Sequence, residues 1–167
     1  VIAVALLEGA DGDLIQSQMS SFGGVKRRFN IEENGQYVYV DDYAHHPQEI
    51  AATLAAAKNY PHREIWCVFQ PHTYTRTKAL MEDFAKALSV ADHVVLADIY
   101  AARETDNLGI SSGTLAEKIA AFGTDTHYFP SFDAIETFLL ENCVNGDLLI
   151  TMGAGDIVKV GEKLLGQ

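Results

Sequence analysis

From residue 36 onward, short runs of β-forming residues alternate with amphipathic helical patterns. This alternation is typical of a parallel sheet whose strands are joined by helices. The run EIWCVFQ (64–70) is apolar through its centre, as expected of a strand covered on both faces. Further strands are predicted in VYVDDY (38–43), HVVLAD (93–98), THYF (126–129) and DLLITM (147–152). We therefore expect an α/β, Rossmann-like fold with a mostly parallel sheet and helices on both faces.

Turn and helix signals separate these strands. Asn34-Gly35 tolerates positive φ angles, so it predicts a tight turn and an N-terminal β-hairpin or strand. Pro47 suits the first turn of a helix, and Ser131 is predicted to cap another. Five apolar stripes are expected on the helices: Ile50, Leu54 and Ala57; Leu80, Phe84, Ala87 and Leu88; Leu115, Ile119 and Phe122; Ile135, Phe138 and Leu139; Ile157, Val160 and Leu164.

The first 29 residues do not follow the alternation. The segment DGDLIQSQMSSF (11–22) predicts a short helix with Leu14, Ile15 and Met19 turned inward. We interpret residues 1–27 as the tail of a preceding domain with its linker, and residues 28–167 as a complete second domain. The chain also begins without methionine, so we expect it to be a piece of a longer protein.

Composition excludes several classes of function. The formal charge of −11 opposes binding to nucleic acid or to an anionic membrane, because both need a concentrated basic face. No apolar run is long enough to span a bilayer. Cys67 and Cys143 lie far apart without CxxC spacing, which argues against a disulfide framework and favours a reducing, cytoplasmic compartment.

Polar residues gather directly after the predicted strands, in DDYAHH, QPHTYTRT, DIYAARE and TMGAGD. In an open parallel sheet, ligands bind beyond the carboxyl ends of the strands, where these loops converge. We therefore expect one rim to hold the functional side chains.

Each candidate on this rim has an alternative role. His45 and His46 could ligate a metal, but neighbouring side chains diverge and no third ligand follows at a recognisable spacing, so no metal site is predicted. Asp41 and Asp42 could cap the next helix, or contact a ribose or a magnesium-bound water. Arg76 enters a helix whose N–H groups would suit a carboxylate or phosphate, and its alternative is a surface salt bridge. The GAGD turn lacks the third glycine of a nucleotide-binding loop.

Five segments carry a resemblance to a known family: GGVKRRF (23–29), VDDYAHHPQEI (40–50), FQPHTYTRTKAL (69–80), DIYAARE (98–104) and TMGAGDI (151–157). In this order and with these gaps they resemble the last domain of the Mur ligases, and most closely the members that add L-alanine to UDP-N-acetylmuramate. Residues 1–22 resemble the end of the family's central ATPase domain.

The resemblance implies an ATP-dependent, cytoplasmic bacterial ligase of peptidoglycan synthesis. ATP would phosphorylate the substrate carboxyl, and the alanine amine would attack the acyl phosphate. Mg²⁺ would offset the crowded negative charge, and both ATP and Mg²⁺ would be bound mainly by the protein's own N-terminal and central domains. The chain alone is therefore expected to be inactive.

The same resemblance suggests roles for seven residues. It places Arg28 at the ATP phosphates, Asp42 toward the ribose and Tyr43 near the adenine. It places His45, with His46 as its neighbour, near the incoming amino acid, and His72 and Arg76 at the alanine carboxylate. Thr73 departs from the family, since many members have arginine there.

Two alternatives remain open at this stage. One is a related Mur ligase that adds or recycles a peptide. The other is a phosphoacceptor, receiver-like signalling domain, because Asp41, Asp42 and Asp98 all fall at predicted strand ends. The last predicted strand ends without the lysine that such an acidic pocket uses, and the linker would have no explanation.

Overall fold

The computed structural model describes residues 2–20, 26–33 and 38–166. Its helices are α1 (Ile2–Leu7), α2 (Gly12–Ser20), α3 (Pro47–Ala57), α4 (Tyr74–Ala79), α5 (Met81–Leu88), α6 (Ser112–Ala120), α7 (Phe132–Asn142) and α8 (Val158–Leu164). Its strands are β1 (Asn30–Glu33), β2 (Val38–Asp42), β3 (Ile65–Phe69), β4 (His93–Leu96), β5 (Asp125–Tyr128) and β6 (Leu148–Met152).

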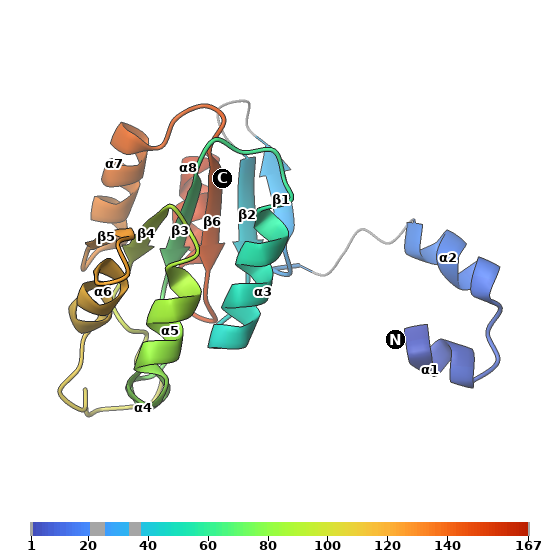
Figure 1. Ribbon diagram of the computed structural model, residues 1–167, viewed down its shortest axis with the longest axis horizontal. Helices are drawn as coiled ribbons and strands as arrows, with labels where there is room; N and C mark the ends of the chain where they lie inside the picture. The colour runs from blue at the N-terminus through green and yellow to red at the C-terminus, as the bar shows by residue number, and fades with distance from the viewer. Residues whose placement is uncertain (1, 21–25, 34–37, 167) are drawn as a thin grey trace.

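These strands form one sheet in the order β1-β2-β6-β3-β4-β5 (Figure 1). The five strands β2 to β6 run parallel, and β1 pairs antiparallel with β2 through Glu33 opposite Val38. The α/β, Rossmann-like prediction is confirmed, and the pairing of β1 with β2 agrees with the N-terminal hairpin. The predicted turn at Asn34-Gly35 lies outside the described residues.

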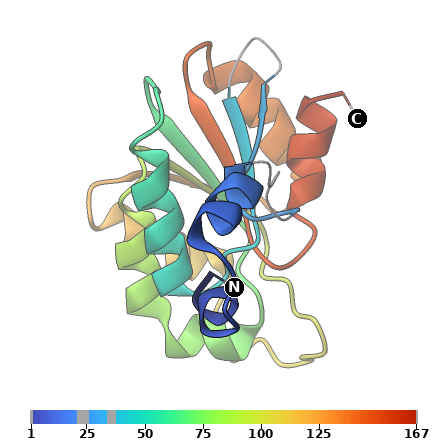
Figure 2. The ribbon, with the colours of Figure 1, turned by 90° about the vertical axis from the view of Figure 1, so that its right-hand side faces the viewer.

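Helices cover both faces of the sheet, as expected. On one face α3, α5 and α6 bury Ile50, Leu54, Phe84, Leu88, Leu115 and Ile119 against alternate residues of the strands. On the other face α7 and α8 bury Ile135, Leu139 and Val160. Figure 2 shows the two layers on either side of the sheet. Because β3 and β6 are covered on both faces, every residue of both strands is buried, which explains their continuous apolar runs.

The helices α3 and α7 begin at the residues that the sequence predicts. Pro47 opens α3, and His46 caps it by accepting a hydrogen bond from the backbone N–H of Gln48. Ser131 Oγ accepts from Ala134 N at the start of α7. These contacts satisfy N–H groups that have no partner inside a helix.

Three expectations about helices were wrong. The segment with Leu80 is not one helix, because the backbone of Leu80 (φ −116°, ψ 23°) leaves the helical region and separates α4 from α5. Phe122 lies beyond the end of α6 and is 56% exposed. Leu14 is also 56% exposed and is therefore not turned inward.

At the amino ends of the strands, one buried carboxylate joins three segments. Asp147 accepts hydrogen bonds from Arg63 Nε (2.8 Å) and Nη2 (3.1 Å), and from the indole of Trp66 (3.1 Å). This polar cluster lies at the opposite end of β3 and β6 from the loops that follow these strands.

Candidate functional site

The loops after β2, β3, β4 and β6 converge at the carboxyl edge of the sheet. The loop after β3 is tied to the loop after β4 by a parallel bridge between His72 and Tyr100. Thr73 N donates to Tyr100 O (2.9 Å), and Tyr100 N donates to Pro71 O (2.8 Å). The structure thus brings the polar loops together at one rim, as the parallel topology requires.

The aromatic rings of three predicted site residues lie close to one another. The His45 ring lies 5.3 Å from the Tyr43 ring and 6.2 Å from the His72 ring, measured between centroids. His45 Nδ1 lies 3.0 Å from the carbonyl oxygen of Tyr43, so this nitrogen carries the proton and donates it. In the neutral ring, Nε2 is then left with a lone pair that can accept a proton.

His72 and Arg76 carry the clearest sign of a ligand site. His72 Nδ1 and Arg76 Nη1 are buried atoms without a hydrogen-bond partner among the described residues. Leaving a buried polar atom unpaired is costly, so these two nitrogens are candidates for contact with a bound ligand. Burial, together with the nearby charge of Arg76, lowers the pKa of His72 below its ordinary 6.5.

Glu104 is a rim residue that sequence reasoning missed. Its Oε2 accepts hydrogen bonds from the backbone N–H groups of Tyr74 (2.5 Å) and Thr75 (3.1 Å), which open the helix that carries Arg76. These are the N–H groups that the sequence offered to a substrate anion, and they are taken by an internal carboxylate. Hydrogen bonds from Thr75 lower the pKa of Glu104. The segment DIYAARE drew attention to this loop, but no local pattern identified Glu104.

The Asp42 carboxylate, at the end of β2, accepts hydrogen bonds from backbone N–H groups. Its Oδ2 accepts from Phe29 N (2.8 Å) and its Oδ1 accepts from Ala44 N (2.7 Å). The side chain is buried, and a ribose hydroxyl could use only the second lone pair of either oxygen. The helix-capping role predicted for this acid is not observed, because His46 caps the next helix and the Asp42 carboxylate binds the backbone of Phe29 and Ala44 instead.

Arg28 and Tyr43 lie side by side. The Arg28 guanidinium carbon is 5.5 Å from the centre of the Tyr43 ring, within the range of a cation–π contact. Arg28 is exposed, so its charge can meet an anion that approaches the rim.

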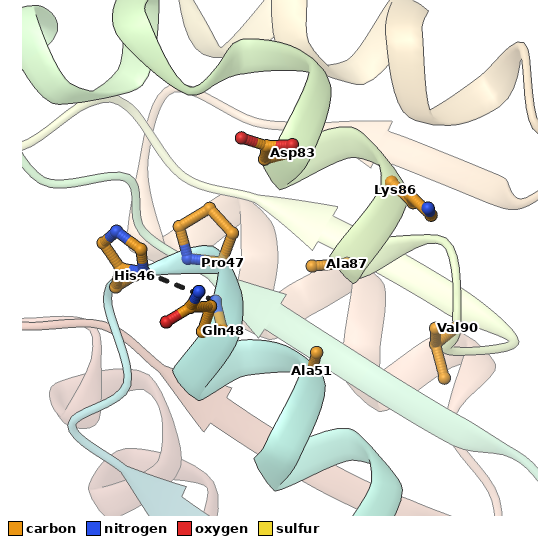
Figure 3. A pocket seen from close by; sticks show the side chains of 8 residues that line it. All are labelled: His46, Pro47, Gln48, Ala51, Asp83, Lys86, Ala87 and Val90. Atoms are coloured by element: carbon orange, nitrogen blue, oxygen red, sulfur yellow. Dashed lines mark hydrogen bonds between the residues drawn. The ribbon is translucent and has the colours of Figure 1, made fainter.

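His46 lies at the amino end of α3, directly before Pro47. As well as capping this helix, it lines a groove of about 370 Å³ between α3 and α5, together with Ala51, Lys86 and Val90 (Figure 3). Figure 3 shows the remaining lining residues, Pro47, Gln48, Asp83 and Ala87, on the same two helices. The structure therefore gives His46 a structural role and does not bring it into the ring cluster of Tyr43, His45 and His72.

Within residues 2–20, 26–33 and 38–166, no group of three or more His, Cys, Asp or Glu side chains could hold a metal ion. The described residues therefore do not fit Mg²⁺ on their own. In the same part of the chain, no helix is long and apolar enough to cross a membrane.

Comparisons with known proteins agree with this architecture. The UDP-N-acetylmuramate–L-alanine ligases of Lachnospira eligens and Agathobacter rectalis are 58% and 56% identical to the chain over 98% of it. The chain spans only 36% of their length.

A solved structure gives the same result. The crystal structure of UDP-N-acetylmuramate-alanine ligase from Thermotoga maritima superposes on 99% of the chain with a TM-score of 0.79 and 26% identity, and the chain covers 35% of it. The folylpolyglutamate synthase/dihydrofolate synthase of Yersinia pestis, at 16% identity, shares the fold alone (TM-score 0.72, 99% of this chain and 38% of its own). The family model described as "Mur ligase, glutamate ligase domain" matches residues 27–155. The chain therefore belongs to the Mur ligase family.

Proposed function

We propose that the chain is the C-terminal, amino-acid-binding domain of an ATP-dependent, cytoplasmic ligase that joins L-alanine to UDP-N-acetylmuramate in peptidoglycan synthesis. Two relatives of that name are 58% and 56% identical to it. The observation that carries the proposal is the pair of buried nitrogens, His72 Nδ1 and Arg76 Nη1, for which the described residues supply no hydrogen-bond partner. The Arg76 guanidinium offers a charged donor, as a small carboxylate ligand requires.

The boundary within the chain follows the same proposal. Residues 1–27 would be the tail of the central ATPase domain with its linker, and residues 28–167 the amino-acid-binding domain. The N-terminal and central domains would hold UDP-N-acetylmuramate, most of the ATP and the Mg²⁺, since the described residues contain no cluster of three or more side chains that could hold a metal ion.

In the reaction, the γ-phosphate of ATP moves to the substrate carboxylate and ADP leaves. The alanine amine then attacks the acyl carbon, and the tetrahedral intermediate expels inorganic phosphate. The chemistry needs this activation because a carboxylate is a poor electrophile, whereas phosphate is a good leaving group.

The residues of this chain would bind and orient the reactants. Arg76 and His72 would bind the alanine carboxylate, and the His45 Nε2 lone pair would take a proton from the alanine ammonium. Arg28 would contact the ATP phosphates, while Tyr43 and Asp42 would lie along the adenosine. His46 would act indirectly, by fixing the start of the helix that follows His45. Closure of this domain over the other two would exclude water from the acyl phosphate.

The test uses the full-length enzyme, with phosphate release measured against L-alanine concentration. Arg76→Ala should raise the KM for alanine tenfold or more, because a charge-assisted carboxylate contact is lost. Lys78→Ala is the matched control, since Lys78 is an exposed cation on the same helix whose Nζ donates to Leu108 O. An unchanged KM in Arg76→Ala would remove Arg76 from the carboxylate site.

Two further measurements separate the alternatives. Turnover with a peptide in place of alanine would identify a peptide-adding or recycling ligase. Measurable ligase turnover by the 167-residue chain alone would contradict its assignment as one domain of a larger active site. Family membership leaves the receiver-like signalling alternative without support.

A further inference from the structure

Arg27 joins the segment 26–29 to two neighbouring parts of the rim. Its Nε donates to Asp41 Oδ2 (3.0 Å), and its two terminal nitrogens donate to the carbonyls of Gly153 (2.8 Å) and Gly155 (3.3 Å). The Arg27 side chain is 21% exposed and that of Asp41 is 5% exposed. Because a guanidinium is planar and its donors have fixed directions, three acceptors, one on β2 and two in the turn after β6, fix its orientation.

The backbone around Arg27 is held as firmly as its side chain. Tyr43 N donates to Arg27 O (2.9 Å), and Phe29 N donates to Asp42 Oδ2 (2.8 Å). Arg27 and Phe29 have φ angles of 59° and 48°, which are uncommon for residues other than glycine and persist where surrounding contacts impose them. Arg28 lies between these two held residues, so their contacts set the direction in which its side chain leaves the backbone.

The glycine turn that Arg27 binds packs against the start of the loop after β3. Asp156 N donates to Gln70 Oε1 (3.0 Å), and Gln70 Nε2 donates to Asp156 Oδ1 (3.2 Å). A Cβ on Gly153 would lie 2.8 Å from the Gln70 carbonyl oxygen, so only glycine allows this approach. Gln70 precedes His72 by two residues, and a short path of direct contacts therefore leads from Arg27 to the loop of His72 and Arg76.

We propose that Arg27 is a positioning residue that fixes Arg28 relative to His72 and Arg76 by binding the glycine turn at 153–155. This proposal rests on the proposed function, because it assigns Arg28 to ATP and Arg76 to the amino acid. Arg27 itself contacts neither ligand, since its donors are directed to Asp41 and the two glycine carbonyls. The effect of its loss should therefore appear in turnover, which depends on alignment of the reactants, more than in alanine binding.

The kinetic test compares Arg27→Ala and Arg27→Lys in the full-length enzyme. Lysine keeps a positive charge beside Asp41 but has a single nitrogen, which cannot reproduce the directions of three guanidinium donors. We expect kcat to fall at least tenfold in both variants, with the KM for alanine changed by less than threefold. Arg27→Lys with wild-type kcat would overturn the proposal, because charge alone would then suffice.

Arg63→Ala is the matched control. Arg63 also pairs with a buried aspartate, Asp147, but at the amino ends of the strands and away from the rim. It should lower the melting temperature and leave kcat within twofold of wild type, measured well below both melting temperatures. A loss of kcat in Arg63→Ala as large as that in Arg27→Ala would overturn the proposal, because general destabilisation would explain both.

Hydrogen exchange of the Phe29 and Tyr43 amides tests the positioning without any ligase assay. In full-length Arg27→Lys both amides should exchange at least tenfold faster than in the wild type, while Lys26→Ala should leave them unchanged. Unchanged protection in Arg27→Lys would overturn the role of Arg27 in holding this segment. If the wild-type enzyme released no phosphate in response to alanine, the proposed function would be refuted. The hydrogen-exchange result would still decide the role of Arg27.

Discussion

The imidazole of His72 stacks on the ring of Tyr100, with 5.3 Å between centroids and 25° between the ring planes. This contact joins the loops after β3 and β4, which are 28 positions apart in sequence at these residues. It also contributes to the burial that, with the charge of Arg76, lowers the pKa of His72.

The lowered pKa of His72 predicts a pH-dependent contribution to stability. The unfolded chain takes up this proton near pH 6.5, whereas the folded chain does so only at lower pH. The contribution is therefore present above pH 6.5 and is lost as the pH falls through this value. The side chain in His72→Gln cannot be protonated, so between pH 7.5 and 5.5 the melting temperature of this variant should fall less than that of the wild type. Parallel melting curves across this range would contradict the prediction.

Glu104 should affect amino-acid binding through the helix that carries Arg76. Glu104→Ala leaves the N–H groups of Tyr74 and Thr75 without their acceptor, so the first turn of α4 loses its cap. We expect the KM for alanine in the full-length enzyme to rise about threefold to tenfold, because the start of the helix that carries Arg76 would lose its cap. Glu104→Gln keeps one acceptor oxygen and should have a smaller effect.

Asp106→Asn is the control for this experiment. Asp106 lies in the same loop, but its Oδ1 accepts a hydrogen bond from Leu108 N within the loop and not from the start of α4. Its KM should stay within twofold of wild type. An equal effect of Asp106→Asn and Glu104→Ala would show that the loop as a whole, and not the cap on α4, controls alanine binding.

Most of the sheet could be predicted because its signals are local. Continuous apolar runs marked β3 and β6, and turn chemistry at Pro47 and Ser131 marked the starts of two helices. The break at Leu80 could not be predicted, because Leu80 packs partly against the core and fits the apolar stripe of either helix. Phe122 continued the spacing of α6, but the helix ends at Ala120.

The sequence predicted where the rim lies, but it predicted fewer of the contacts between the rim's side chains. Parallel topology alone requires the loops to meet at one edge, and the structure brings Tyr43, His45 and His72 together there. The roles of Arg27 and Glu104 could not be predicted, because each binds a residue that is distant in sequence. Arg27 binds Gly153, which is 126 positions away, and Glu104 binds Tyr74, which is 30 positions away. A polar residue whose partners are distant in sequence leaves no spacing pattern to detect.

Asp147 should be one of the largest polar contributors to stability. Its buried carboxylate accepts hydrogen bonds from Arg63, Trp66 and Val144. Asparagine would replace one acceptor oxygen with an NH₂ group, which would face these N–H donors. Since Arg63 is half exposed and its charge is screened, we expect Asp147→Asn to cost about 2 kcal/mol of unfolding free energy, measured by urea denaturation of the chain at pH 7.

The same residue predicts a pH dependence. Burial raises the pKa of Asp147, but hydrogen bonds from Arg63 and from the backbone of Val144 outweigh burial and hold it below 3.8. A lowered carboxyl pKa gives stability that is present above pH 3.8 and lost as the pH falls below it. The stability difference between wild type and Asp147→Asn should therefore shrink as the pH approaches 3. A constant difference would indicate that the variant loses packing and not charge.

Two helical glycines should respond in opposite directions to alanine. A Cβ on Gly161 in α8 would overlap the ring of Tyr39, which is 2% exposed and held by a 2.5 Å hydrogen bond to Thr151. Alanine gains about 1 kcal/mol of helix propensity there, but overpacking a fixed ring costs about 1–3 kcal/mol or more, so Gly161→Ala should be destabilising.

A Cβ on Gly113 in α6 would meet only Ser111 Oγ at 3.4 Å and Tyr128 at 3.8 Å, which are ordinary contacts. Gly113→Ala should therefore stabilise the chain by about 0.5–1 kcal/mol. Urea denaturation of both variants checks the pair, and stabilisation by Gly161→Ala would mean that α8 can move away from Tyr39 without loss of packing.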